Sequence, residues 1–144
     1  QTWVELRLAE VYLNRAEANF RLGNSGPAIS DLNTVRGRSG VALPPLSGLS
    51  GDALFKAIRQ ERKIELAYEG HLYWDMRRWR LAHTEYNGYR VHGMKISNSK
   101  DGWLYEYVDC DLQDRKFLEK TYVLPVPYSE MENNGAIEQY DEWK

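Results

Sequence analysis

The sequence is poor in cysteine, in long apolar runs and in unbalanced charge, and each lack excludes a class of protein. Its single cysteine, Cys110, cannot form an internal disulfide, and no neighbouring Cys or His stands at the spacing of a zinc ligand. No apolar run approaches the roughly 20 residues that a membrane-spanning helix needs. The 19 basic and 21 acidic residues are spread along the chain, so no basic stripe would attract a phosphate backbone. The sequence therefore argues against nucleic acid as a partner, and it predicts neither a metal nor another cofactor.

The start of the chain lacks the features of a targeting segment. It opens with Gln1, without a charged stretch followed by an apolar one, and it enters a helical pattern almost directly. We therefore expect residues 1–144 to be a fragment of a longer protein whose secretion signal or lipid anchor would lie upstream. With 144 residues and 42% hydrophobic content, the fragment can bury one core, which predicts a single domain.

Apolar residues that recur every three or four positions predict two pairs of helices between residues 4 and 82. The expected helices cover 4–22, 25–35, 51–69 and 71–81. Gly23 ends the first helix, and Pro27 suits the first turn of the second, so these two form an antiparallel hairpin. The small residues along this hairpin and its glycine turn partly match a tetratricopeptide (TPR) repeat.

For the remainder of the chain, residues 83–144, the sequence predicts an irregular segment that contains a small β-hairpin and ends in an extended C-terminal strap. Two β-prone runs, 89–96 and 103–108, flank a turn-rich stretch that contains Asn, Ser, Asp and Gly. Alternating prolines in 122–127 exclude a helix and predict an extended segment. The fold class is therefore mostly α, with antiparallel TPR-like helical hairpins and an irregular segment that carries the β-hairpin.

Several blocks, in their order along the chain, resemble the SusD/RagB family of nutrient-binding lipoproteins. They are LRLAEVYLNRAEA at 6–18, LNTVRGR at 32–38, ERKIELAYEG at 61–70, DMRRW at 75–79 and YVLPVPYSE at 122–130. Each block alone is ordinary helix or strap sequence. Their combination covers nearly the whole chain and is typical of the C-terminal region of that family.

The resemblance implies a non-catalytic, starch utilization system-like function in the outer membrane of Bacteroidetes. Such a subunit lies over a SusC-like TonB-dependent transporter and holds an oligosaccharide or polysaccharide, or sometimes a peptide, for import. It would be an outward-facing lipoprotein, attached to the membrane only through an N-terminal lipid anchor outside this fragment. A TPR-like scaffold that binds a protein or peptide is the alternative, because helical repeats commonly bind proteins through their concave face.

The most charged block suggests a structural ionic layer. Glu61, Glu65 and Glu69 follow each other at helical spacing on one face and need cations. Arg77 and Arg78, on the next expected helix, are the partners that the sequence offers. A pair of catalytic carboxylates, as in a glycosidase, is the weaker alternative, since those groups must flank a sugar in a cleft.

Other chemistry has little support in the sequence. His71 and Asp75, one helical turn apart, could share a metal ion, but no third strong ligand is evident and a hydrogen-bonded structural histidine is the preferred interpretation. No Ser or Cys lies in a nucleophile-elbow sequence, and no glycine-rich phosphate loop follows a strand. We therefore assign no catalytic and no metal-binding residue.

Aromatic residues outside the helices are the better functional lead. Sugar rings stack their apolar C–H faces on aromatic rings, while nearby polar side chains bind the hydroxyls. The candidate ligand-binding residues are Tyr86, Tyr89, Trp103, Tyr105 and Tyr107. Strand alternation puts the last three on one face, where packing against the helices as part of the core is the preferred interpretation and ligand contact is the alternative.

Overall fold

The computed structural model describes residues 6–111 and 113–144, and the chain divides into two compact units, residues 1–74 and 75–144. The predicted fold class is confirmed, because the chain is mostly helical and carries one small antiparallel sheet. Within the described residues, no helix is both long enough and apolar enough to cross a membrane.

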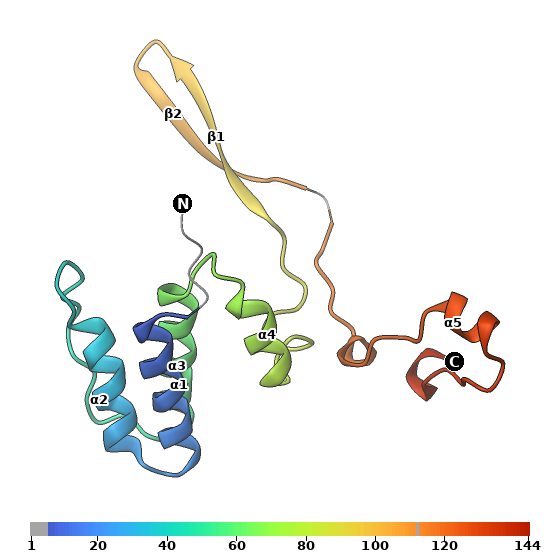
Figure 1. The fold of residues 1–144 in the computed structure, drawn as a ribbon. Coiled ribbons are helices and arrows are strands. Elements are labelled where there is room, and N and C mark those ends of the chain that lie inside the picture. The colour runs from blue at the N-terminus through green and yellow to red at the C-terminus, as the bar shows by residue number, and fades with distance from the viewer. Residues whose placement is uncertain (1–5, 112) are drawn as a thin grey trace. The chain divides into compact units, whose positions relative to one another are not determined.

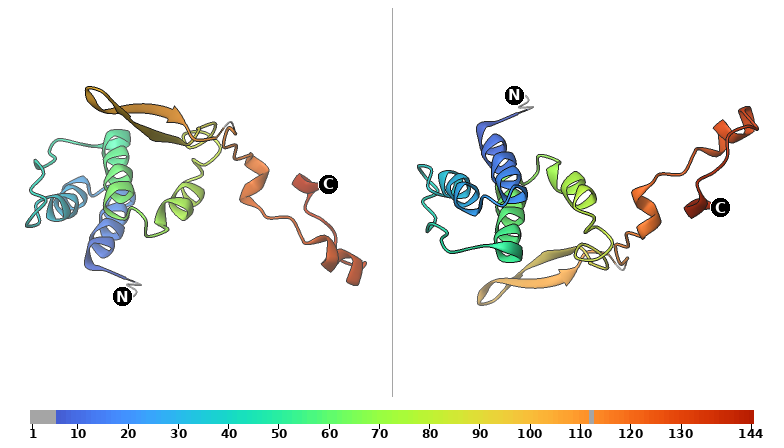
Figure 2. Two further views of the ribbon diagram at one scale, coloured as in Figure 1. Left: turned by 90° about the horizontal axis from the view of Figure 1, so that it is seen from above. Right: turned by 90° about the horizontal axis from the view of Figure 1, so that it is seen from below.

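Three helices that lie side by side build the first unit (Figures 1 and 2). They are α1 (Leu8–Arg21), α2 (Ser25–Arg36) and α3 (Gly51–Glu65). The start predicted for the first helix, Val4, lies outside the described residues. Gly23 (φ 79°) turns the chain between α1 and α2, and the fully buried Ala16 and Ala28 allow these two helices to approach closely. The shared core consists of Leu13, Ala16, Ala28, Leu32, Val35, Leu54, Ile58 and Leu66.

Side chains of α2 fasten the loop that connects it to α3. Asn33 Nδ2 donates to the carbonyl of Leu46 at 2.9 Å, and Asn33 Oδ1 accepts from the Leu46 N–H at 2.7 Å. Arg36 donates from Nε and Nη2 to the carbonyl of Pro44, at 3.0 and 2.9 Å. These bonds satisfy backbone groups of a loop that contains no helix or strand.

Two helices end earlier than the apolar pattern predicted. α3 ends at Glu65 and α4 (His71–Arg78) ends at Arg78, whereas the expected ends were 69 and 81. A residue with left-handed backbone follows each end: Tyr68 has φ 65° and Arg80 has φ 59°. A residue with positive φ cannot continue a right-handed helix. Neither tyrosine nor arginine is a residue type from which a sequence would predict positive φ.

The second unit contains an antiparallel hairpin of β1 (His92–Ser99) and β2 (Gly102–Asp109), joined by a two-residue turn. Gly102, directly after the turn, has φ 116°, which favours glycine. The first strand was expected to begin at Tyr89, which instead forms an isolated bridge with Arg115 before β1 starts.

The C-terminal strap is extended, as its prolines predicted, and later residues hold it in place. The short helices around it are 3₁₀ helices at Glu119–Tyr122 and Asp141–Trp143 and an α-helix, α5, at Tyr128–Asn133. The Val126 N–H donates to Gln139 Oε1 at 2.9 Å, and Gln139 Nε2 donates to the Val126 carbonyl at 3.1 Å. Trp143 Nε1 donates to the Val123 carbonyl at 2.8 Å. Gln139 thus pairs with the strap as a neighbouring strand would.

Replacement of Asn33 tests how the loop is held. Asn33→Ala is expected to lower the free energy of unfolding by about 1–3 kcal/mol, because two backbone groups of Leu46 lose their partners. Gln60→Ala, at an exposed position of α3, is the matched control and should change stability by less than about 0.5 kcal/mol. Chemical denaturation of both variants measures the difference, and equal effects would show that the Asn33 bonds do not hold the loop.

Candidate functional site

The register of the β-hairpin sorts its side chains onto two different faces. Residues directly opposite each other in an antiparallel pair project to the same side of the sheet. The register pairs Met94 with Tyr107, Ile96 with Tyr105 and Asn98 with Trp103. One face therefore carries five large apolar or aromatic side chains, which we call the aromatic face: Met94, Ile96, Trp103, Tyr105 and Tyr107.

All five side chains of the aromatic face are exposed. Their exposed fractions run from 56% for Met94 to 70% for Tyr107, with Trp103 at 65%. Buried large apolar residues are the rule in folded proteins, and adjacent exposed ones mark surfaces that bind something. Within the second unit, Trp103, Tyr105 and Tyr107 are therefore exposed, and both ligand contact and packing remain interpretations of these three residues.

The opposite face of the hairpin is more polar. Lys95 Nζ lies 3.4 Å from Glu106 Oε2, its direct cross-strand neighbour. Ser97 pairs with Leu104 on the same side, Gly93 pairs with half-buried Val108 at one end of the face, and Ser99 pairs with Gly102 at the other. The hairpin is thus amphipathic, with most of its large apolar side chains on one face.

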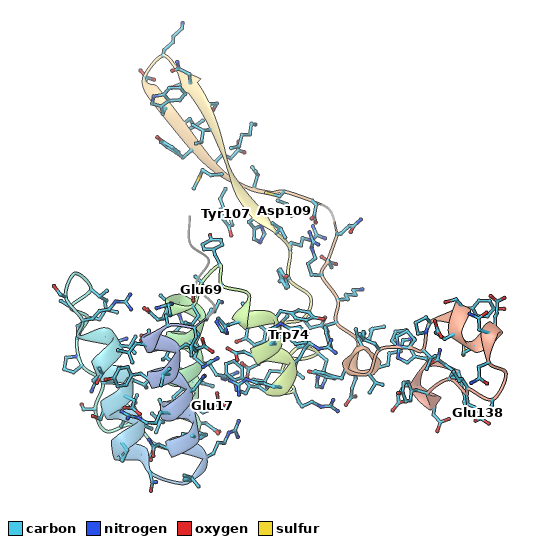
Figure 3. The ribbon with its side chains drawn as sticks, in the orientation of Figure 1. Glu17, Glu69, Trp74, Tyr107, Asp109 and Glu138 are labelled. Atoms are coloured by element: carbon cyan, nitrogen blue, oxygen red, sulfur yellow. The ribbon has the colours of Figure 1, made fainter. Side chains whose placement is uncertain are left out.

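A cluster of paired polar side chains borders the aromatic face where β1 begins and β2 ends. His92 Nδ1 lies 2.7 Å from Asp109 Oδ1, and the His92 ring packs at 4.8 Å from the Tyr107 ring. Arg90 donates from Nε to Asp114 at 2.6 Å and from Nη1 to Asp109 at 3.2 Å. The hydrogen bonds to Asp114 and Asp109 raise the pKa of Arg90, and the Arg90 bond lowers the pKa of Asp114. Figure 3 labels Tyr107 and Asp109, which both project from β2.

The structure does not bring all five predicted aromatics together. Tyr89 is 57% exposed but precedes β1, and Tyr86 is half-buried further upstream. Met94 and Ile96 were missed, although both share the aromatic face. Alternation along β1 contains this signal, but only the register tells which of its two sides faces Trp103.

The three glutamates of the predicted ionic layer meet arginines that the sequence analysis did not name. Glu65 accepts from Arg7 Nη1 at 2.6 Å and also from Arg38. Arg7 also donates from Nε to both carboxylate oxygens of Glu69, at 3.0 and 2.9 Å. Figure 3 labels Glu69 near the end of α3. A single arginine at the start of α1 therefore ties together the residues that end α3 and the turn after it.

Arg77 and Arg78, the cations expected from the sequence, make contacts within the second unit. Arg77 Nη2 donates to the Tyr122 carbonyl at 3.0 Å, and Arg78 Nε donates to Asp75 Oδ1 at 2.8 Å. The charge opposite Glu61 comes from Arg36 in α2. Spacing along a helix identified the carboxylates, but not the side chains that fold back onto them.

Burial and arginine contacts act in opposite directions on the buried glutamate. Burial alone would raise the pKa of Glu65, but the hydrogen bonds from Arg38 and Arg7 outweigh it and hold that pKa below its usual value. The Arg7 bonds likewise lower the pKa of the more exposed Glu69. Both carboxylates are therefore ionised at neutral pH and serve as fixed partners of Arg7.

His71 lies near a carboxylate other than the one considered from the sequence. Its Nε2 is 3.8 Å from Glu10 Oε2, while Asp75 accepts from Arg78. In residues 6–111 and 113–144, no group of three or more His, Cys, Asp and Glu side chains is arranged to hold a metal ion.

Comparisons with known proteins place the chain in a family. The model of the SusD family matches residues 1–143. The SusD-like protein P2 of Formosa agariphila is 30% identical over 142 residues, which cover 94% of this chain. The SusD-like protein P25 of the same organism is 38% identical over 78 residues, 53% of this chain and 15% of its own length. The chain belongs to the SusD family.

A solved structure agrees with this assignment. The crystal structure of a SusD-like protein from Bacteroides fragilis superposes with a TM-score of 0.79 at 31% sequence identity and covers 96% of this chain. The chain spans 24% of the length of SusD-like protein P2 and 25% of the Bacteroides fragilis chain. The family match therefore concerns about a quarter of the relatives' length.

Replacement of Glu65 tests the arginine network. Glu65→Gln should lower the free energy of unfolding at neutral pH by about 2 kcal/mol, because Arg7 and Arg38 lose a charged acceptor. Glu106→Gln, in an exposed pair, is the control and should cost less than about 0.5 kcal/mol.

The same variant changes how stability depends on pH. Because the folded pKa of Glu65 is depressed, its contribution is complete above the ordinary glutamate pKa and is lost as pH falls through the folded value. Unfolding curves between neutral and acidic pH should therefore converge for the wild type and Glu65→Gln. Curves that stay parallel throughout would contradict the assigned contribution of Glu65.

Proposed function

We propose that the chain is part of a non-catalytic, glycan-binding subunit of a SusCD-type nutrient-uptake complex. The subunit captures an oligosaccharide or polysaccharide by stacking and hydrogen bonding, without a covalent step. Membership in the SusD family supports this nutrient-binding function. A SusC-like TonB-dependent transporter is the proposed partner, and an outward-facing lipoprotein of the outer membrane is the proposed location.

The aromatic face is the observation that carries the assignment of the site. A sugar ring offers an apolar C–H face to an aromatic ring, and the surrounding hydroxyls require polar partners nearby. Trp103, Tyr105 and Tyr107 supply exposed rings on one strand face. Asn98 at one end and the His92–Asp109 pair at the other lie on the same side and provide hydrogen-bonding groups.

Tyr86 and Tyr89 have a smaller part in this proposal. Tyr89 is exposed next to Arg90, whose charges are paired with Asp109 and Asp114, so it extends the candidate site beyond the strand ends. Tyr86 is half-buried and lies upstream of the hairpin. We therefore assign ligand contact chiefly to the three aromatic residues of β2.

The rival function is a TPR-like scaffold that binds a protein or peptide through its helices. The α1–α2 hairpin with its alanine contacts fits that class as well as it fits a SusD-like subunit. The two functions differ in their ligands, because a helical scaffold has no reason to bind sugars. Glycan binding that depends on the β-hairpin discriminates between them.

Calorimetric titration of the intact protein with soluble oligosaccharides and polysaccharides tests the proposal. Trp103→Ala is expected to weaken glycan binding by more than about 1 kcal/mol through loss of a stacking surface. Leu104→Ala, one residue further on the opposite face, is the matched control and should leave the affinity unchanged.

The outcomes separate the candidates. Binding that Trp103→Ala weakens supports a glycan site on the hairpin. Binding that neither variant changes would move the site away from the aromatic face and leave the fragment as its support. A protein that binds no glycan at all would make peptide capture or scaffolding the leading function.

A further inference from the structure

We infer that a pocket at the junction of α3 and α4 binds a small aromatic carboxylate. The pocket has a volume of about 490 Å³, and all the residues that line it belong to the first unit. Its walls come from the end of α3, the turn that follows and the start of α4, between Arg62 and Tyr73. The inference goes beyond the proposed glycan-binding function, and the two sites share no residue.

The pocket has the size and the lining of a small-molecule site. Ligand pockets in proteins commonly enclose about 300–1,000 Å³ and have mostly apolar walls with a few polar groups. Leu66, Ala67 and Leu72 supply apolar walls, and Tyr68 and Tyr73 add two aromatic rings. The volume equals the space of about 16 water molecules, so it accommodates an apolar ligand of about that many non-hydrogen atoms.

Tyr68 has a strained backbone at this pocket. Its φ of 65° lies in the left-handed region, which is unfavourable for a bulky residue. Its side chain is fully exposed, so burial of the ring in the core does not offset the strain. Strained residues of this kind cluster at sites that hold ligands, and here a ligand supplies the contacts that the exposed ring lacks.

Hydrogen bonds from Arg7 fix the turn that carries Tyr68. The Arg7 guanidinium donates to the carboxylate and the backbone carbonyl of Glu65, where α3 ends. It also donates to both carboxylate oxygens of Glu69, directly after Tyr68. The turn is therefore held on both sides of Tyr68, and a wall that is already fixed loses little conformational freedom when a ligand binds.

The second ring of the pocket, that of Tyr73, also has a fixed neighbour. It packs edge-on against the ring of Trp74, with centroids 5.1 Å apart and an angle of 80° between the planes. Figure 3 labels Trp74 on α4. Aromatic pairs in offset-stacked or edge-to-face arrangements contribute more than their buried area alone. Two tyrosine rings in one pocket therefore favour an aromatic ligand over an alkyl chain.

The charged residues that line the pocket are cations. Arg62 and Lys63 line it, and none of the described acidic residues does. Arg62 is buried and donates to Asn14 Oδ1 at 2.6 Å, whereas Lys63 is exposed. The carboxylates of Glu61 and Glu65, on either side of this pair in sequence, are bound by arginines from other segments. A ligand carboxylate at the pocket gains a charge-assisted hydrogen bond from the Lys63 ammonium.

Calorimetric titration of the intact protein with three small probes tests the ligand class. The first probe, 2-naphthoate, has an aromatic body and a carboxylate. The second, 2-naphthylmethanol, keeps the ring system without the charge, and the third, octanoate, keeps the charge without the ring. We expect 2-naphthoate to bind about tenfold more tightly than either of the others, because only it uses both the tyrosine rings and Lys63.

Variants of the pocket locate the bound probe. Lys63→Gln should weaken 2-naphthoate binding about tenfold, whereas Lys56→Gln, at an exposed position of α3 outside the pocket, should leave it unchanged. Tyr68→Gly removes the ring and also relieves the positive φ. It should therefore weaken binding about tenfold without lowering the melting temperature. Trp103→Ala, in the β-hairpin, should not change the affinity for 2-naphthoate.

Several results would overturn the inference. Failure of 2-naphthoate to bind would do so, as would equal affinity for 2-naphthylmethanol or octanoate. Binding that Lys63→Gln and Tyr68→Gly leave unchanged would place the probe elsewhere. A melting temperature that falls with Tyr68→Gly would mean that protein covers the ring, as would a dimer in light scattering that this variant dissociates. Each of these results leaves glycan binding by the β-hairpin untouched, so the two proposals fail independently.

Discussion

The buried carboxylate of Glu65 is the constraint on which the first unit depends. Its side chain is 9% exposed, and a charge in such a place is tolerated only with close partners. Arg7, before α1, and Arg38, after α2, both donate to it, so one group joins the ends of three helices. The nearby ion pair between Arg36 and Glu61 likewise joins α2 to α3. Arg36 also donates to the Pro44 carbonyl in the loop between these two helices. Packing of the apolar core supplies the bulk of the stability, while these pairs fix how the helix ends meet.

A different constraint, strand register, decides which side chains of the hairpin in the second unit share a face. A slip of one residue would move a strand's side chains to the other face, so the pairing of Ile96 with Tyr105 and of Met94 with Tyr107 creates the aromatic face. Cross-strand pairs of this kind also stabilise a two-stranded hairpin, which is marginal alone. The same contacts therefore hold the hairpin together and set the rings of β2 on one face.

The sequence predicted the elements better than it predicted their contacts. Helical periodicity located α1 to α4, and the turn-rich stretch before Trp103 located the hairpin, because both signals are local. The partners of Glu65 were missed because Arg7 and Arg38 lie 58 and 27 residues away in sequence, and only folding brings them together. The predicted extension of α3 to residue 69 was wrong because Tyr68 adopts φ 65°, which a right-handed helix cannot include and which its residue type does not suggest. Met94 and Ile96 were missed because a face of a sheet is defined by register, not by one strand alone.

The central claim is that Trp103 contacts the captured glycan. The most direct measurement is an NMR titration of the ¹⁵N-labelled intact protein with a soluble oligosaccharide that it binds, observing the indole N–H signals of the five tryptophans of this chain and assigning that of Trp103 with Trp103→Phe. The account predicts that the Trp103 signal shifts in proportion to bound ligand, while the signals of Trp74, Trp79 and Trp143 stay in place. Saturating ligand that leaves the Trp103 signal unchanged would contradict it.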